Sequence, residues 1–159
     1  MGFIDENRVQ EYISELKIIP EKFDHKFKDK GCGHIQADHI ITGKNGTQFS
    51  ISIRQSKFNP LDFSVILGVI IGNRVNILAR YNGDHGEHTN KLTGEKFSGC
   101  HIHRVKNIYQ DHGWKAEGHA EPTKKYADWQ GALQTLLQEN NFQLKNQRRV
   151  TEEWKAKPS

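Results

Sequence analysis

The sequence predicts an α+β fold: an antiparallel meander sheet of four to five strands, packed on one face by an N-terminal and a C-terminal helix. Three observations support this class. An apolar stripe with helical spacing lies near each end of the chain, several apolar or alternating segments lie between them, and turn-forming residues separate these segments. The 159 residues suit one domain, which we expect at residues 1–145, followed by a charged tail at 146–159.

The two helices are predicted at residues 5–17 and 123–139. Asp5 can cap the first, and Pro122-Thr123 precede the second. The first stripe consists of Val9, Tyr12, Ile13 and Leu16, and the second of Tyr126, Trp129, Leu133, Leu136 and Leu137. Both stripes recur with the helical period, so each helix should bury one side.

Four strands are predicted between the helices, at residues 35–42, 47–54, 61–71 and 74–81. Asn45-Gly46 is a strong hairpin signal between the first two. Tight turning is also predicted at Gly72-Asn73. A short fifth strand is expected at 99–104 and an edge strand at 142–145, while 21–34 and 82–99 are predicted as loops and 105–122 stays ambiguous.

Side-chain alternation assigns the faces of these strands. Ser50, Ser52 and Arg54 share one face of the second strand. The fourth strand places Arg74, Asn76 and Arg80 opposite Val75, Ile77 and Ala79, with Leu78 as an exception. We therefore expect an open sheet face that is polar and cationic.

Composition narrows the class of protein. The net charge is +4 and the pI is about 9.0, which is compatible with a polyanionic partner. No apolar run approaches the length of a membrane span, and the N-terminus lacks the pattern of a signal peptide. With only Cys32 and Cys100, thiols or ligands are expected rather than a disulfide. These features predict a cytoplasmic protein and leave its oligomeric state open.

The segment 81–103 is the most informative stretch for function. It holds four of the nine histidines, together with Cys100. Histidine side chains bind metals and exchange protons near neutral pH. The segment matches no catalytic signature of known chemistry, so its residue types and spacing carry the argument.

The leading hypothesis concerns His101-Ile102-His103. If Ile102 points into the core, the two histidines point together to the open face, which also carries Arg54 and Arg80. Histidines can act as base and acid, and arginines bind phosphate oxygens. This predicts a protein acting on RNA or another phosphate-rich ligand, as a metal-independent ribonuclease if it is an enzyme. The candidate catalytic residues are His101, His103, His88 and His85, and the candidate substrate-binding residues are Arg54, Arg80, Arg74 and Asn90.

Two alternatives remain open. The first is a zinc-binding hydrolase or zinc-stabilised domain with Cys32, His34, Cys100 and His101 as ligands. A variant of it is an all-histidine site, made of His85, His88, His101 and His103. Neither cysteine–histidine pair has the spacing of a zinc finger. The second alternative is a non-enzymatic protein-binding module, in which these polar residues are solvated or shape turns.

Three motifs resemble an uncharacterised family of small bacterial and phage-associated domains. They are His85-x-x-His88-Thr89-Asn90, Phe97-x-Gly99-x-His101-Ile102-His103 and Tyr126…Ala132-Leu133, and they cover roughly the C-terminal half. The resemblance carries no activity. It implies a bacterial or mobile-element setting, in which small cationic nucleases, toxins and phage-defence proteins are common.

Overall fold

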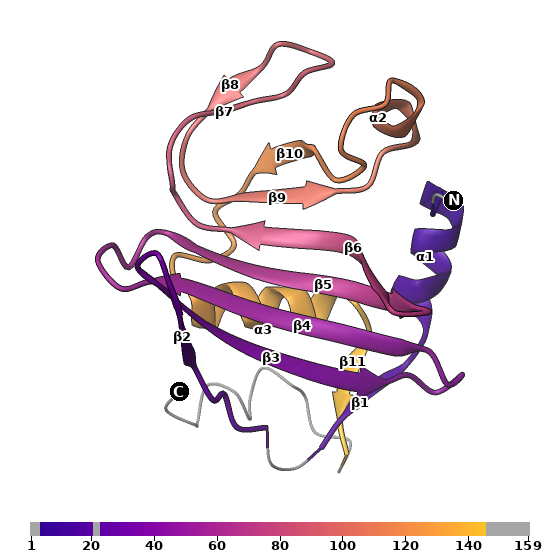
Figure 1. Cartoon of the computed structure of the whole chain (residues 1–159). Helices are drawn as coiled ribbons and strands as arrows, with labels where there is room; N and C mark the ends of the chain where they lie inside the picture. Colours follow the sequence, from indigo (N-terminus) through magenta and orange to yellow (C-terminus); the bar gives the residue numbers. More distant parts are fainter. Residues whose placement is uncertain (1–3, 21–22, 146–159) are drawn as a thin grey trace.

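The computed structural model describes residues 4–20 and 23–145, so the predicted tail at 146–159 lies outside the described residues. Its main feature is a seven-stranded antiparallel sheet with the order β10-β9-β6-β5-β4-β3-β2 (Figure 1). The α+β class is confirmed, and the sheet is larger than the predicted four to five strands. The strands are β2 (Lys28–Gly31), β3 (His34–Thr42), β4 (Gln48–Ser56), β5 (Phe63–Ile71), β6 (Arg74–Asn82), β9 (His101–Arg104) and β10 (His119–Pro122).

The central meander, β3 to β6, follows the predicted alternation and turns. Gly46, at φ 86°, donates its N–H to the carbonyl of Gly43 and closes the β3–β4 turn. In the register of β4 and β5, Ile53 lies opposite Val65, and both are fully buried. Apolar positions two residues apart therefore face one core, as a strand period requires.

The two additional strands lie at the edges of the sheet. β2 falls within the segment predicted as a loop at 21–34, and all of its residues are exposed. The ambiguous segment 105–122 contains a short helix, α2 (Asn107–Asp111), followed by β10. Neither edge strand has an apolar alternation, which explains why local sequence did not predict them.

Helix α3 (Trp129–Glu139) packs on β4, β5 and β6, whereas α1 (Glu6–Ser14) lies at one end of the sheet (Figure 1). α3 begins later than predicted because Asp128 caps it, accepting from the N–H of Gly131 at 2.8 Å. A separate parallel pair, β1 (Lys17–Ile19) and β11 (Phe142–Leu144), follows the two helices in sequence. Among the helices of the described ranges, none has the length and apolar character that crossing a membrane requires.

A β-bulge divides β6 into two parts, and the alternation of side chains between the two sheet faces reverses at the bulge. The register shifts between Leu67 and Gly68, so Leu78 is the extra residue. Before the bulge, Asn76 lies opposite buried Val69, on the helix-packed face. Val75 therefore faces outward and is 58% exposed. The prediction that Arg74, Asn76 and Arg80 share one face is wrong for this reason.

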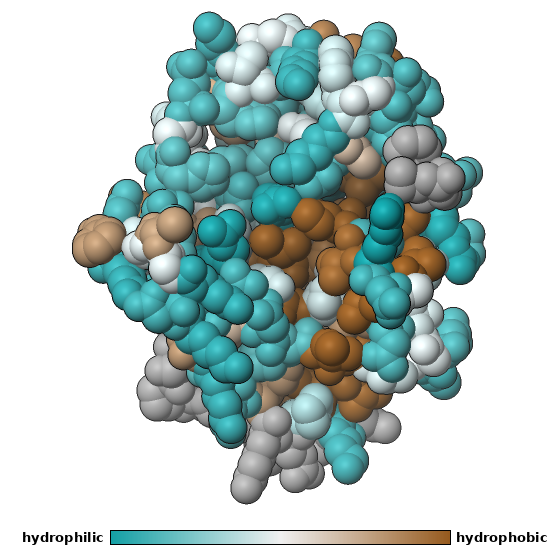
Figure 2. Space-filling model, in the orientation of Figure 1, coloured by the Kyte–Doolittle hydropathy of each residue, from teal (hydrophilic) through white to brown (hydrophobic). Residues whose placement is uncertain are grey.

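The open face of the sheet is consequently divided into an apolar part and a polar part. The apolar part includes Ile40, Ile70, Val75 and Ile77. Figure 2 shows hydrophobic side chains over the central strands and hydrophilic ones over the end formed by β9, β10 and the segments above them. The predicted polar, cationic face is thus restricted to this end and to the adjoining ends of β4 and β5, where Arg54 lies opposite Ser64, and the candidate site lies there.

Candidate functional site

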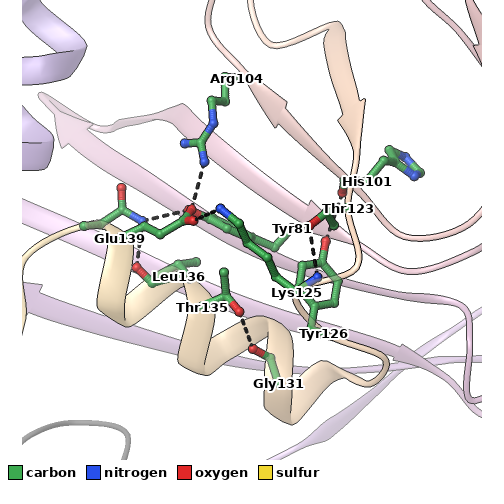
Figure 3. Close-up of polar contacts among 11 residues, drawn as sticks. Tyr81, His101, Arg104, Thr123, Lys125, Tyr126, Gly131, Thr135, Leu136 and Glu139 are labelled. Atoms are coloured by element: carbon green, nitrogen blue, oxygen red, sulfur yellow. Dashed lines mark hydrogen bonds and ion pairs between the residues drawn. The ribbon is translucent and has the colours of Figure 1, made fainter.

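His101 and His103 leave β9 on the face away from α3. Ile102, between them, is 6% exposed and belongs to the helix-packed core, as predicted. His101 lies opposite Asn82 and His103 opposite Arg80 in the neighbouring strand β6. Figure 3 shows the His101 side chain pointing away from the polar contacts on the α3 side.

The loop histidines join this strand pair. The ring of His88 lies 5.5 Å from that of His101 and 5.0 Å from that of His103, centroid to centroid. His101 and His103 are themselves 5.0 Å apart, and His85 is 5.3 Å from His101. The four candidate catalytic residues therefore form one cluster, which we call the histidine cluster. The loop covers the strand, and His101 is only 1% exposed.

Backbone carbonyls orient the two strand histidines. Nδ1 of His101 lies 2.8 Å from the carbonyl oxygen of Gly99. Nδ1 of His103 lies 2.9 Å from the carbonyl oxygen of Glu117. These two contacts fix the rotation of each ring within the cluster. Nε2 of His101 is buried and has no hydrogen-bond partner among the described residues.

Asn90 positions the third histidine. His88 belongs to β7 (His88–Thr89), which pairs with β8 (Lys96–Phe97) in a small separate hairpin. Asn90 follows β7 and is fully buried. Its side chain bonds both the N–H and the carbonyl of Ala120 on edge strand β10, at 2.9 and 2.8 Å. Its Oδ1 also lies 2.9 Å from Nε2 of His88, so the hairpin and the ring are fixed together.

The two strand histidines of the cluster favour the neutral imidazole form. Burial lowers the pKa of His101, and the neighbouring His85 and His88 lower it further. Burial, reinforced by His101 and His88, lowers the pKa of His103 to about 3. Neutral rings offer lone pairs to a metal or a proton, whereas a general acid at neutral pH must be protonated. The arrangement therefore suits a ligand or base role better than the acid role predicted for one of these residues.

A cavity of about 400 Å³ opens beside the cluster. All four clustered histidines line it. Its charged and aromatic lining includes Arg80, Lys91, Tyr109, Trp114, Lys115 and Glu117. The Glu117 carboxylate accepts from Nη2 of Arg80 at 3.1 Å, and this carboxylate is only 9% exposed. The guanidinium is thus held beside the histidines with a fixed orientation.

A second cavity, of about 390 Å³, adjoins the first. Arg80, Asn82 and His85 line both cavities. Arg54, exposed on β4, and Asp62 line only the second. The two predicted arginines therefore face one continuous polar surface, with His85 between the two cavities.

Two predicted substrate-binding residues are not brought to this surface. Arg74 lies beyond the bulge, opposite Ile71 at the far end of β6, and lines neither cavity. Asn90 is near the cluster, but it is buried and its amide is engaged by Ala120 and His88. We assign Asn90 a positioning role in place of substrate contact.

The mixed cysteine–histidine set does not assemble. Cys32 is exposed in the turn between β2 and β3. His34 lies beside it, with Nε2 3.7 Å from Asp62. Cys100 packs against the core, and burial raises the pKa of its thiol. Within the described residues, the group of potential metal ligands that meets is His88, His101 and His103, so the predicted Cys32, His34, Cys100 and His101 set is corrected.

Sequence reasoning missed Glu117 and Tyr109, which line the first cavity. Glu117 lies in the segment 105–122, whose structure was ambiguous, and nothing in its local pattern marks it. Trp114 lines the first cavity and stacks on His112 at 4.6 Å. Lys91 lies 5.7 Å from the same indole ring. Contacts between residues distant in sequence bring these side chains together.

Comparisons with known proteins add no further information. No family model matches the chain, and searches of curated proteins and of solved structures gave no match. The resemblance to small bacterial and phage-associated domains therefore stays a prediction.

Proposed function

We propose that this protein binds RNA or another phosphate-bearing ligand on the polar part of the open face and acts on it at the histidine cluster. The observation that carries the proposal is the continuity of the two cavities. They share Arg80, Asn82 and His85, so Arg54, Arg80 and the clustered histidines face one ligand-sized surface. Arginine forks match phosphate oxygens, and the net charge of +4 favours encounter with a polyanion.

The chemistry assigned to the site is hydrolysis or transfer at a phosphoryl group. Arg80, held by Glu117, would contact phosphate oxygens next to the histidines. Arg54 would bind a neighbouring phosphate or the far end of the ligand, because it lines only the second cavity. His101 and His103, which burial favours in the neutral form, supply lone pairs for base catalysis or for a metal.

The test is a binding and cleavage assay on mixed-sequence RNA oligonucleotides, at low and at physiological salt. We expect wild-type protein to bind RNA. Arg54→Gln should weaken binding about tenfold, because it removes one charged hydrogen bond. Arg74→Gln is the matched control, because it removes an arginine from the other part of the same sheet. Equal losses in both variants would indicate a general charge effect and contradict the proposed surface.

Catalysis is tested in the same assay with His101→Ala and His103→Ala. Each should abolish cleavage while leaving RNA binding within a few-fold of wild type. Parallel reactions with EDTA separate metal-independent from metal-dependent cleavage. Wild-type protein that neither binds nor cleaves RNA, phosphomonoesters or phosphodiesters would refute the proposal and leave the zinc-binding and protein-binding alternatives.

A further inference from the structure

The hydrogen bonds within the histidine cluster determine which ring nitrogens carry hydrogen. A carbonyl oxygen can only accept, so Nδ1 of His101 and Nδ1 of His103 must donate to Gly99 and Glu117. In a neutral ring the other nitrogen then holds a lone pair. Nε2 is therefore the free coordinating atom of both strand histidines.

The same reasoning applies to His88 through Asn90. Ala120 fixes the orientation of the Asn90 amide, because its N–H needs an acceptor and its carbonyl needs a donor. The atom of Asn90 that meets Nε2 of His88 is thus an oxygen, and Nε2 must donate to it. The lone pair of His88 lies on Nδ1. A hydrogen bond from the second nitrogen to an amide or carbonyl oxygen is the usual support of a metal-bound histidine.

The three rings also converge in space. One ligand atom from each of His88, His101 and His103 lies within 4.8 Å of the other two. Tetrahedral zinc with bonds of about 2.0–2.1 Å needs nitrogens roughly 3.3 Å apart. Small ring movements, on the order of 1 Å, would close that difference.

A bound cation would also explain a buried atom that has no partner. Nε2 of His101 is buried without a hydrogen bond, which is costly for a polar group. The tautomer places a lone pair on this nitrogen, and the other two histidines adjoin it. A cation bonded to all three would satisfy it.

We propose that His88, His101 and His103 form a three-histidine site for a divalent transition metal, with zinc as the first candidate. The first cavity borders all three residues, so a fourth position is open to water or a ligand. Three protein ligands and an open position are typical of catalytic rather than structural zinc. On the phosphate ligand of the proposed function, water bound there would give a proton to solvent and attack phosphorus as hydroxide; the P–O bond to the leaving group would break, and the leaving oxygen would take a proton from solvent.

The site stands independently of the phosphate ligand, because it depends only on the three rings and their hydrogen bonds. Its test therefore uses no nucleic acid. Protein without a histidine tag is stripped with EDTA, dialysed and titrated with Zn²⁺ in competition with a chromophoric chelator. A parallel titration uses Co²⁺ and follows the visible absorption of the four-coordinate ion.

We expect one metal per chain for wild-type protein, and at least a 100-fold loss of affinity in His88→Ala, His101→Ala and His103→Ala. His88→Ala is the decisive variant, because His88 lies on β7, outside the main sheet, so we expect its truncation to leave that sheet folded. Circular dichroism and thermal unfolding of the apo protein verify this. His85→Ala and His112→Ala are the matched controls and should bind metal as wild type does.

The possible outcomes are distinguishable from failure of the phosphate proposal. No stoichiometric Zn²⁺ or Co²⁺ in wild-type protein overturns the metal site, whatever the RNA assay gives. Wild-type affinity in folded His88→Ala also overturns it. Loss of metal in His85→Ala would indicate a closed four-histidine site and refute the open position.

Discussion

Asn90→Ala is the perturbation that most directly tests how the site is built. The side chain of Asn90 is fully buried and makes four hydrogen bonds, to the N–H and carbonyl of Ala120, to His88 and to Glu95. Truncation leaves two backbone groups of fully buried Ala120 without these partners. Each buried unsatisfied group costs about 1–3 kcal/mol.

We expect Asn90→Ala to lower the free energy of unfolding by about 2–4 kcal/mol, since water can replace part of the lost bonding at this edge strand. Urea denaturation followed by fluorescence and circular dichroism measures the change. Asn76→Ala is the matched control, because its amide makes one long bond of 3.5 Å, and its stability should stay within about 0.5 kcal/mol of wild type. A loss below about 0.5 kcal/mol for Asn90→Ala would refute the role given to the Asn90–Ala120 contact.

The same residue separates stability from metal affinity. Asn90→Ala removes the acceptor of His88 Nε2 and should weaken zinc binding about 10–100-fold. Asn90→Asp keeps an oxygen for His88 but loses the donor to the Ala120 carbonyl. We therefore expect Asn90→Asp to destabilise the fold and yet retain most of the zinc affinity. Equal zinc affinity in Asn90→Ala and wild-type protein would show that this acceptor does not position His88.

The remaining predictions concern the helix-packed side and the close approach of Gly83 to Phe63. Burial opposes ionisation of Glu139, but its hydrogen bonds, led by that from Lys125, outweigh burial and lower its pKa below 4.5. The stability that the ionised Glu139 contributes is thus complete above about pH 4.5 and is lost as the pH falls through the lower folded pKa. Glu139→Gln should therefore lower the free energy of unfolding at pH 7 and lower it much less near pH 3, as measured by urea denaturation. A difference that does not change with pH would contradict this. Tyr126→Phe removes a hydroxyl that contacts carbonyls of β6 and β9, and should lower the free energy of unfolding by about 1 kcal/mol in urea denaturation. Gly83→Ala would place a methyl group 2.5 Å from a ring atom of Phe63 and should lower stability by about 2 kcal/mol or more; an unchanged thermal midpoint would contradict that overlap.

The central strands could be predicted from sequence because their periodicity is local. Alternation and turn residues located β3 to β6 within one or two residues of their observed ends. The edge strands could not, because β2 is exposed throughout and exists by pairing with β3. Leu78 did carry a signal of the bulge: it was the one apolar residue that broke the alternation of the fourth strand. Reading that exception as a bulge would have moved Arg74 away from Arg80.

The candidate site was predictable only in part, for a related reason. His101 and His103 followed from the burial of Ile102 and strand alternation. Their assembly with His88 depends on Asn90 and Ala120, which lie 30 residues apart and bond through a side chain. No local pattern encodes such a contact. The predicted cysteine–histidine ligand set was wrong because it was chosen by residue type and local spacing. These do not determine which side chains meet in the fold, and Cys32 does not join the cluster.

Strand β9 is anchored on both of its faces, and this gives the site its geometry. On the α3 side, the Tyr126 hydroxyl lies 2.9 Å from the carbonyl of Asn82 and 3.0 Å from that of His101, across the β6–β9 pair. On the other side, the His101 ring enters the cluster. Because backbone and ring are held by different partners, His101 has little freedom to follow a ligand. His88 lies on a two-residue strand outside the main sheet and is tied to β10 through Asn90. Closure around a metal would therefore move the hairpin about the Asn90–Ala120 contact rather than the sheet.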